Sequence, residues 1–103
     1  MHREQDIIQW AKERNIFVGG TPVGQATKTL EEAVELLDAI NKRSTAEIAD
    51  AIGDIMVTLI IQAKMWKLDM NACIEQAYNQ IKDRRGVMRD GKFLKDVEPA
   101  HGC

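Results

Sequence analysis

Residues 46–61 read AEIADAIGDIMVTLII, an apolar stretch that nevertheless carries three acids. Glu47, Asp50 and Asp54 follow one another at i, i+3 and i+7, which on an α-helix forms a single stripe. Almost all the other residues are Ile, Ala, Met, Val or Leu, and a helix that is apolar on most of its circumference is normally buried. Because unpaired carboxylates are costly in such surroundings, the stripe predicts basic groups or metal ions as partners.

The length and charge distribution limit the possible functions. A chain of 103 residues suffices for one domain, so we expect a single domain over residues 1–103. The small core that such a chain can bury favours an oligomer. The net charge is only −2, but residues 30–54 hold seven acids and two bases, whereas residues 82–95 hold six bases and two acids. Opposite charges of this kind suit one ligand that needs both, such as a metal–phosphate complex.

Cysteine usage and hydropathy indicate the compartment. Cys73 and Cys103 are too few for a disulfide framework or a zinc site, and reduced thiols are typical of cytosolic proteins. The N-terminus lacks the apolar region of a signal peptide. The longest apolar run, IMVTLII, is about a third of a membrane span. We therefore expect a soluble, cytoplasmic protein with no membrane partner.

The hydrophobic periodicity predicts four helices, running from about Arg3 to Arg14, from Thr21–Pro22 to about Asn41, from Ser44 or Thr45 to about Lys67, and from Asp69 or Asn71 to about Arg84. NIFVGGTP breaks the pattern after the first helix, and Asp90-Gly91 is a strong two-residue hairpin signal. Short loops imply antiparallel neighbours. We therefore expect an all-α fold, a four-helix bundle with a short C-terminal β-hairpin.

Acids on two of these helices are spaced to converge. On the second helix Glu31 and Glu32 can share one side with Glu35, because they precede it by four and three residues. On the third helix Glu47 and Asp50 are again i, i+3. Two antiparallel helices joined by a short loop can present these groups to each other. The alternative for the first set is an ordinary solvated helix face.

Ligation by oxygen alone selects hard cations, so the pattern predicts Mg²⁺, with Mn²⁺ as a substitute. Asp54 is an additional ligand candidate, either at the metal or near Gly53 as a capping group. The only histidines, His2 and His101, stand near the chain ends, which argues against a di-iron bundle built on Glu-x-x-His.

Basic and polar groups suited to phosphate lie before and after the acids. Lys82 and Arg85 follow Asn79 at about one-turn intervals, and Arg can grip phosphate oxygens in a bidentate manner. The alternatives are a solvated basic helix end and, for the tryptophans, simple core packing. A nucleic-acid partner is not expected, because the basic segment is short and has little aromatic interleaving. The candidate substrate contacts are Gln25, Lys28, Asn79, Lys82, Arg85 and, by stacking on a base, Trp10.

The segment QATKTLEEAVEL at residues 25–36, followed by EIAD at 47–50, resembles the signature of the MazG family, EExxE followed at a short distance by ExxD. The segment AYNQIKDRRGVMRDGKF resembles the end of small MazG-like proteins, and the likeness runs from about Trp10 to Phe93. Some family members place their last Asp in a Gly-Asp pair, here Gly53-Asp54, a register in which Ala51 replaces a glutamate. EIAD is preferred because both acids are present, with Asp54 retained.

The resemblance implies an all-α, Mg²⁺-dependent nucleoside triphosphate pyrophosphohydrolase that forms homodimers or homotetramers. It implies metal binding by Glu32, Glu35, Glu47 and Asp50. Glu31 matches the first glutamate of the signature, so Glu31 or Glu35 is expected to orient or deprotonate the attacking water. Lys82 and Arg85 match basic positions near the phosphates, and Asn79 and Lys28 match less closely.

Three rivals remain open at this point. An all-α dUTPase and a phosphoribosyl-ATP pyrophosphohydrolase use the same carboxylate chemistry on other substrates. A noncatalytic helical assembly module, with its acids paired to Lys and Arg across an interface, would gain no thermal stability from Mg²⁺.

Overall fold

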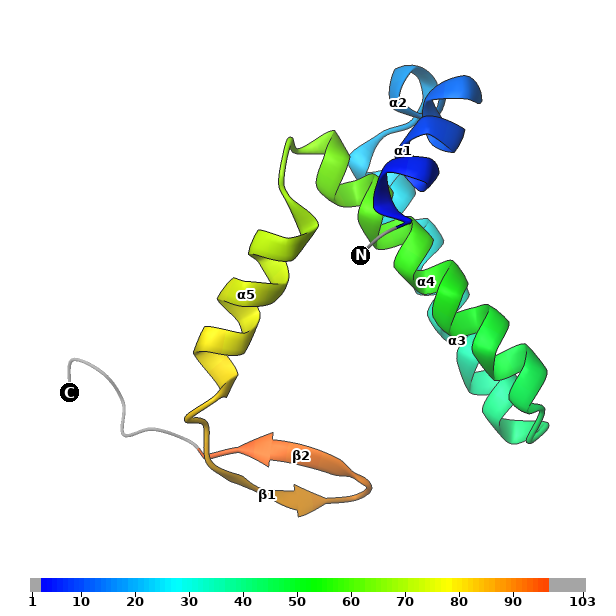
Figure 1. Ribbon diagram of the computed structural model, residues 1–103. Helices are drawn as coiled ribbons and strands as arrows, with labels where there is room; N and C mark the ends of the chain where they lie inside the picture. Colours follow the sequence, from blue (N-terminus) through cyan, green and yellow to red (C-terminus); the bar gives the residue numbers. More distant parts are fainter. Residues whose placement is uncertain (1–2, 97–103) are drawn as a thin grey trace. The chain divides into compact units, whose positions relative to one another are not determined.

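The computed structural model describes residues 3–96 as five helices and one β-hairpin (Figure 1). In chain order the elements are α1 (Glu4–Glu13), α2 (Ile16–Gly19), α3 (Pro22–Asn41), α4 (Thr45–Met65), α5 (Met70–Ile81), β1 (Gly86–Arg89) and β2 (Lys92–Lys95). The helical fold and the C-terminal hairpin are thus confirmed, although five helices replace the expected four. By its contacts the chain forms two compact units, Met1–Asn71 and Ala72–Cys103.

The additional helix, α2, lies inside NIFVGGTP, the stretch that the sequence predicts to be a non-helical connection. Asn15 adopts a left-handed conformation with φ of 60°, which asparagine tolerates better than most residues. One helical turn follows, and Gly20 then returns the backbone to an extended conformation. A single turn is too short to produce a hydrophobic period, so the sequence pattern does not reveal it.

The central feature of the first unit is the antiparallel pair of α3 and α4, which lie side by side (Figure 1). Thr21 caps α3 by accepting a hydrogen bond from the Gly24 amide at 3.0 Å, and Pro22 occupies the first helical position. Ser44 caps α4 in the same way through the Glu47 amide, at 3.2 Å. Within residues 3–96, no helix combines the length and the apolar character needed to cross a bilayer.

A polar seam fixes the register of α3 against α4. The Thr29 hydroxyl donates to the hydroxyl of the buried Thr58 at 2.8 Å, and Thr58 donates in turn to the Ile55 carbonyl at 2.7 Å. Gln25 Nε2 donates to the Thr58 carbonyl at 3.1 Å. Since buried polar groups are costly when unpaired, sliding one helix along the other would lose these bonds together.

The apolar core lies on a different side of α4, where α1 packs. Ile8, Ile60, Ala63 and Met70 form the buried cluster. Ile7, Phe17 and Met56 pack against this cluster and are partly buried. Because Thr58 faces α3 and Ile60 packs with Ile8 of α1, α4 uses two of its faces as interfaces, which explains its high apolar content.

The second unit contains most of α5 and the β-hairpin. β1 and β2 pair antiparallel, with Gly86 opposite Lys95 and Arg89 opposite Lys92. Asp90 and Gly91 form the two-residue connection with φ of 53° and 78°, the positive values that a type I′ turn requires. The hairpin expected from the Asp-Gly pair is therefore confirmed. The preceding helix ends at Ile81, three residues before the expected Arg84.

Candidate metal centre

The α3–α4 pair brings three carboxylates together. Glu32 and Glu35 lie one turn apart on α3, and Asp54 lies on α4. One carboxylate oxygen from each can be chosen so that all lie within 4.8 Å of one another. Within residues 3–96, no second set of three His, Cys, Asp or Glu side chains is arranged in this way. We refer to these three residues as the carboxylate cluster.

Glu32 is the unusual member of the carboxylate cluster because it is buried, with only 7% of its surface exposed. Its Oε1 lies 3.6 Å from the Lys28 ammonium group. Its Oε2 is shielded from solvent and has no hydrogen-bond partner among the described residues. A buried carboxylate oxygen without a donor is energetically costly. A hard cation bound by the cluster would remove this cost, so the oxygen-only donor set fits Mg²⁺ or Mn²⁺.

Glu35 is solvent-exposed, yet its pKa is raised above the ordinary value of 4.5. The main cause is the hydrogen bond that Glu35 donates to the Glu32 side chain when it is protonated, followed by the negative charge of Glu32. Lys28 opposes the shift, and Asp54 adds to it. A cation between these carboxylates would favour their ionised forms and so compete with the proton on Glu35.

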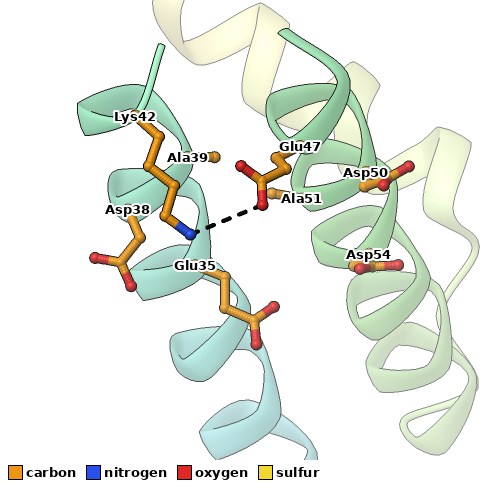
Figure 2. A pocket seen from close by; sticks show the side chains of 8 residues that line it. All are labelled: Glu35, Asp38, Ala39, Lys42, Glu47, Asp50, Ala51 and Asp54. Carbon is orange, nitrogen blue, oxygen red and sulfur yellow. Dashed lines mark ion pairs between the residues drawn. The ribbon is translucent and has the colours of Figure 1, made fainter. Parts of the chain in front are cut away.

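A pocket of about 330 Å³ opens beside the cluster between α3 and α4. Figure 2 shows its lining, Glu35, Asp38, Ala39, Lys42, Glu47, Asp50, Ala51 and Asp54. Ala39 and Ala51 are buried, and their small side chains leave space between the helices. Lys42 is the single base of this lining, and its Nζ lies 3.8 Å from Glu47 Oε1 (Figure 2). The other acids of the lining, Glu35, Asp38, Asp50 and Asp54, make the pocket suitable for binding a cation.

Comparison with known proteins shows which family the chain belongs to. A model of the MazG nucleotide pyrophosphohydrolase domain matches residues 22–86, which include both helices of the carboxylate cluster. The chain belongs to the MazG family. It is also 38% identical over 65 residues to an uncharacterized 18.2 kDa protein from the rep-hol intergenic region of Haemophilus phage HP1. That match covers 63% of this chain but only 40% of the phage protein. No solved structure matches the chain.

The two halves of the MazG signature occupy different positions around the cluster. EExxE contributes Glu32 and Glu35, whereas Asp54 joins them from beyond the ExxD segment. Glu47 and Asp50 line the adjoining pocket instead. The register of α3 against α4 explains why Asp54 joins the cluster and Glu47 does not.

Because Thr29 of α3 pairs with Thr58 of α4, the antiparallel arrangement brings Asp54 level with Glu32. Glu47 is seven residues from Asp54, about 10 Å along the helix axis. Ligation by Glu47 and Asp50 stays a prediction.

Three other predicted site residues of the first unit have structural contacts of their own. Lys28 lies between two acids, with its Nζ 3.7 Å from Glu31 and 3.6 Å from Glu32. Gln25 is used in the polar seam with Thr58. Trp10 lies on α1, and the Arg14 guanidinium is 4.5 Å from the centre of its ring. Only Lys28 therefore contacts the carboxylate cluster through an ion pair.

Asn79 lies near the end of α5, Lys82 directly follows this helix, and Arg85 directly precedes β1. All three belong to the second unit. Their contribution to phosphate binding stays a prediction.

Sequence reasoning did not select Asp38 and Lys42 as site residues, although both line the pocket. A signal was present in the spacing, because Asp38 follows Glu35 by three residues and Lys42 follows Asp38 by four. The sequence alone does not show that α3 and α4 leave a pocket beside Asp38.

We predict that Mg²⁺ raises the melting temperature of the protein through the carboxylate cluster. A ligand at a hundredfold excess over its Kd stabilises the folded state by about 2.7 kcal/mol. Differential scanning fluorimetry with and without Mg²⁺ should show this shift in the wild type and in the control Glu13→Gln. The shift should be absent in Glu32→Gln and Asp54→Asn. An equal shift in all four proteins would contradict the site.

The raised pKa of Glu35 predicts a pH dependence of stability in the absence of metal. The folded chain holds this proton more tightly than the unfolded chain, so folding stability falls as pH rises from 4.5 to the raised pKa. Melting temperatures between about pH 4 and pH 8 should therefore decline less in Glu35→Gln than in the wild type. Saturating Mg²⁺ should reduce the decline in the wild type. Identical profiles for the two metal-free proteins would show that Glu35 does not titrate in this manner.

Proposed function

We propose that the protein is a Mg²⁺-dependent nucleoside triphosphate pyrophosphohydrolase. It would add water across the bond between the α- and β-phosphates of an NTP or dNTP, yielding the nucleoside monophosphate and pyrophosphate. The observation that supports this most is the carboxylate cluster, in which the buried Glu32 lacks a donor for Oε2, in a chain of the MazG family. We place the reaction in the cytoplasm, where reduced thiols such as that of Cys73 are usual.

Metal binding is assigned to the carboxylate cluster, with Glu47 and Asp50 as further ligands in the pocket. A bound Mg²⁺ supplies a Lewis acid for phosphoryl oxygens and lowers the pKa of a coordinated water. Glu32 would be the least mobile of these metal ligands, because it is buried. Such a fixed ligand orients the site before substrate arrives, which is favourable for catalysis by positioning.

Proton transfer is assigned to Glu31, with Glu35 as the second candidate. Glu31 lies outside the carboxylate cluster and pairs with Lys28, which also contacts Glu32. It is therefore close to the metal ligands without being needed as one. Lys28 and Lys42 form ion pairs with Glu32 and Glu47, and Asn79, Lys82 and Arg85 are proposed as further phosphate contacts.

We also propose that the protein assembles as a homodimer or homotetramer. Leu30, Val34 and Leu37 are spaced as i, i+4 and i+7 on α3, and each is at least half exposed. This spacing places them on one face of the helix, and an exposed apolar face of this kind favours association. A second copy would cover it and so enlarge a small core.

Incubation with a panel of NTPs and dNTPs, followed by phosphorus NMR, tests the proposed reaction. We expect monophosphate and pyrophosphate with Mg²⁺ and neither product with EDTA. Glu31→Gln should lower kcat by about 10²- to 10⁴-fold while keeping the Mg²⁺-dependent thermal shift. Glu35→Gln should lose both. Loss of both in Glu31→Gln as well would make Glu31 a ligand instead.

Other products or substrates would identify a rival. Diphosphate and orthophosphate would contradict the assigned bond. Turnover restricted to dUTP or to phosphoribosyl-ATP would favour the corresponding specialised enzyme. No turnover and no thermal shift would favour a noncatalytic assembly module.

A further inference from the structure

A second hollow of the first unit lies between α1 and α4 and reaches the carboxylate cluster. It is formed by two adjoining cavities of about 430 and 450 Å³, which share Ile7, Val57 and Asp54. Asp54 also lines the acidic pocket and belongs to the cluster. We call this hollow the α1–α4 groove and define it by Arg3, Asp6, Ile7, Trp10, Asp54 and Val57.

The chemistry of the groove differs from that of the acidic pocket. Ile7, Trp10 and Val57 give it apolar walls, and the size is within the usual range for small-molecule sites. The Arg14 guanidinium covers the Trp10 ring and also donates to the Trp10 carbonyl at 3.1 Å, so the indole is held in place. A flat aromatic ligand in the groove would therefore contact the indole of Trp10.

One end of this groove carries a polar pair. Arg3 Nη1 donates to Asp6 Oδ2 at 2.9 Å, and the Asp6 side chain makes no other hydrogen bond within residues 3–96. Arg3, Asp6 and Trp10 succeed each other at i, i+3 and i+7, so α1 places them on one side. Asp6 Oδ1 thus remains available as an acceptor beside the apolar walls.

We infer that the α1–α4 groove is the base subsite of the nucleotide and that Asp6 selects bases bearing an exocyclic amine. This inference rests on the proposed function. A nucleoside triphosphate has a highly charged end and a flat, weakly polar end. The acidic pocket with bound metal suits the first, the groove suits the second, and Asp54 joins the two.

The preference follows from the acceptor chemistry of Asp6. A carboxylate accepts hydrogen bonds and donates none, so it pairs with the amino groups of cytosine, adenine and guanine. Uracil and thymine present a carbonyl oxygen at the position where cytosine has its amine, and two acceptors repel each other. The remaining donors of Arg3 are available for the base carbonyls. Asp6 is therefore a specificity-determining residue.

Binding and turnover together test the inference. In the full-length protein with Trp66→Phe, Trp10 is the remaining tryptophan and reports on the groove. With Mg²⁺, the α,β-imido analogue of dCTP should quench its fluorescence at concentrations about tenfold lower than the dUTP analogue. Asp6→Asn should reduce this ratio to about threefold or less, because an amide both donates and accepts. The matched control Glu75→Gln should leave the ratio unchanged.

The two readouts separate the inference from the proposed function. Binding with the expected preference but without hydrolysis of dCTP would support the groove and contradict the proposed reaction. Hydrolysis with equal kcat/KM for dCTP and dUTP in wild type and Asp6→Asn would overturn the inference and leave the reaction standing. Absence of quenching by either analogue would also overturn it, since a bound base must contact Trp10.

Discussion

The buried carboxylate of Glu32 is the constraint on which the other features of the first unit depend. An ionised group in the interface of two helices is costly, and Lys28 satisfies only one of its two oxygens. The polar seam around Thr29 and Thr58 holds the two helices in one register. Asp54 is thereby placed near Glu32 and Glu35. The hydrogen bond that protonated Glu35 makes with Glu32, followed by the negative charge of Glu32, raises the pKa of Glu35, and a divalent cation would favour the ionised carboxylates instead.

Helix α4 explains how such a small unit combines a core with a polar site. One side packs on α3 and carries Ala51 and Thr58, and another carries Ile60 and Ala63 against α1. Asp54 lies where these two interfaces meet, since it lines hollows on both sides. A charged cavity and an apolar groove consequently share one residue. This geometry suits a ligand that is itself charged at one end and flat at the other.

Much of this organisation could be predicted from local sequence signals. Thr21-Pro22 and Ser44 act over a few residues as helix caps, and Asp90-Gly91 acts as a turn, so their structural effects could be read directly. The register of α3 against α4 depends instead on hydrogen bonds between residues about thirty positions apart. Helical periodicity showed that the acids share faces but not which acids are level. That is why the carboxylate cluster contains Asp54, which the sequence offered only as an additional candidate, and does not contain Glu47.

Manganese placed in crystals of the protein tests the central claim most directly. Mn²⁺ takes the same oxygen ligands as Mg²⁺ and is visible by anomalous diffraction. The account predicts an anomalous peak with carboxylate oxygens of Glu32, Glu35 and Asp54 at about 2 Å. Ordered Mn²⁺ bound only elsewhere, with the three carboxylates metal-free at saturating Mn²⁺, would contradict it.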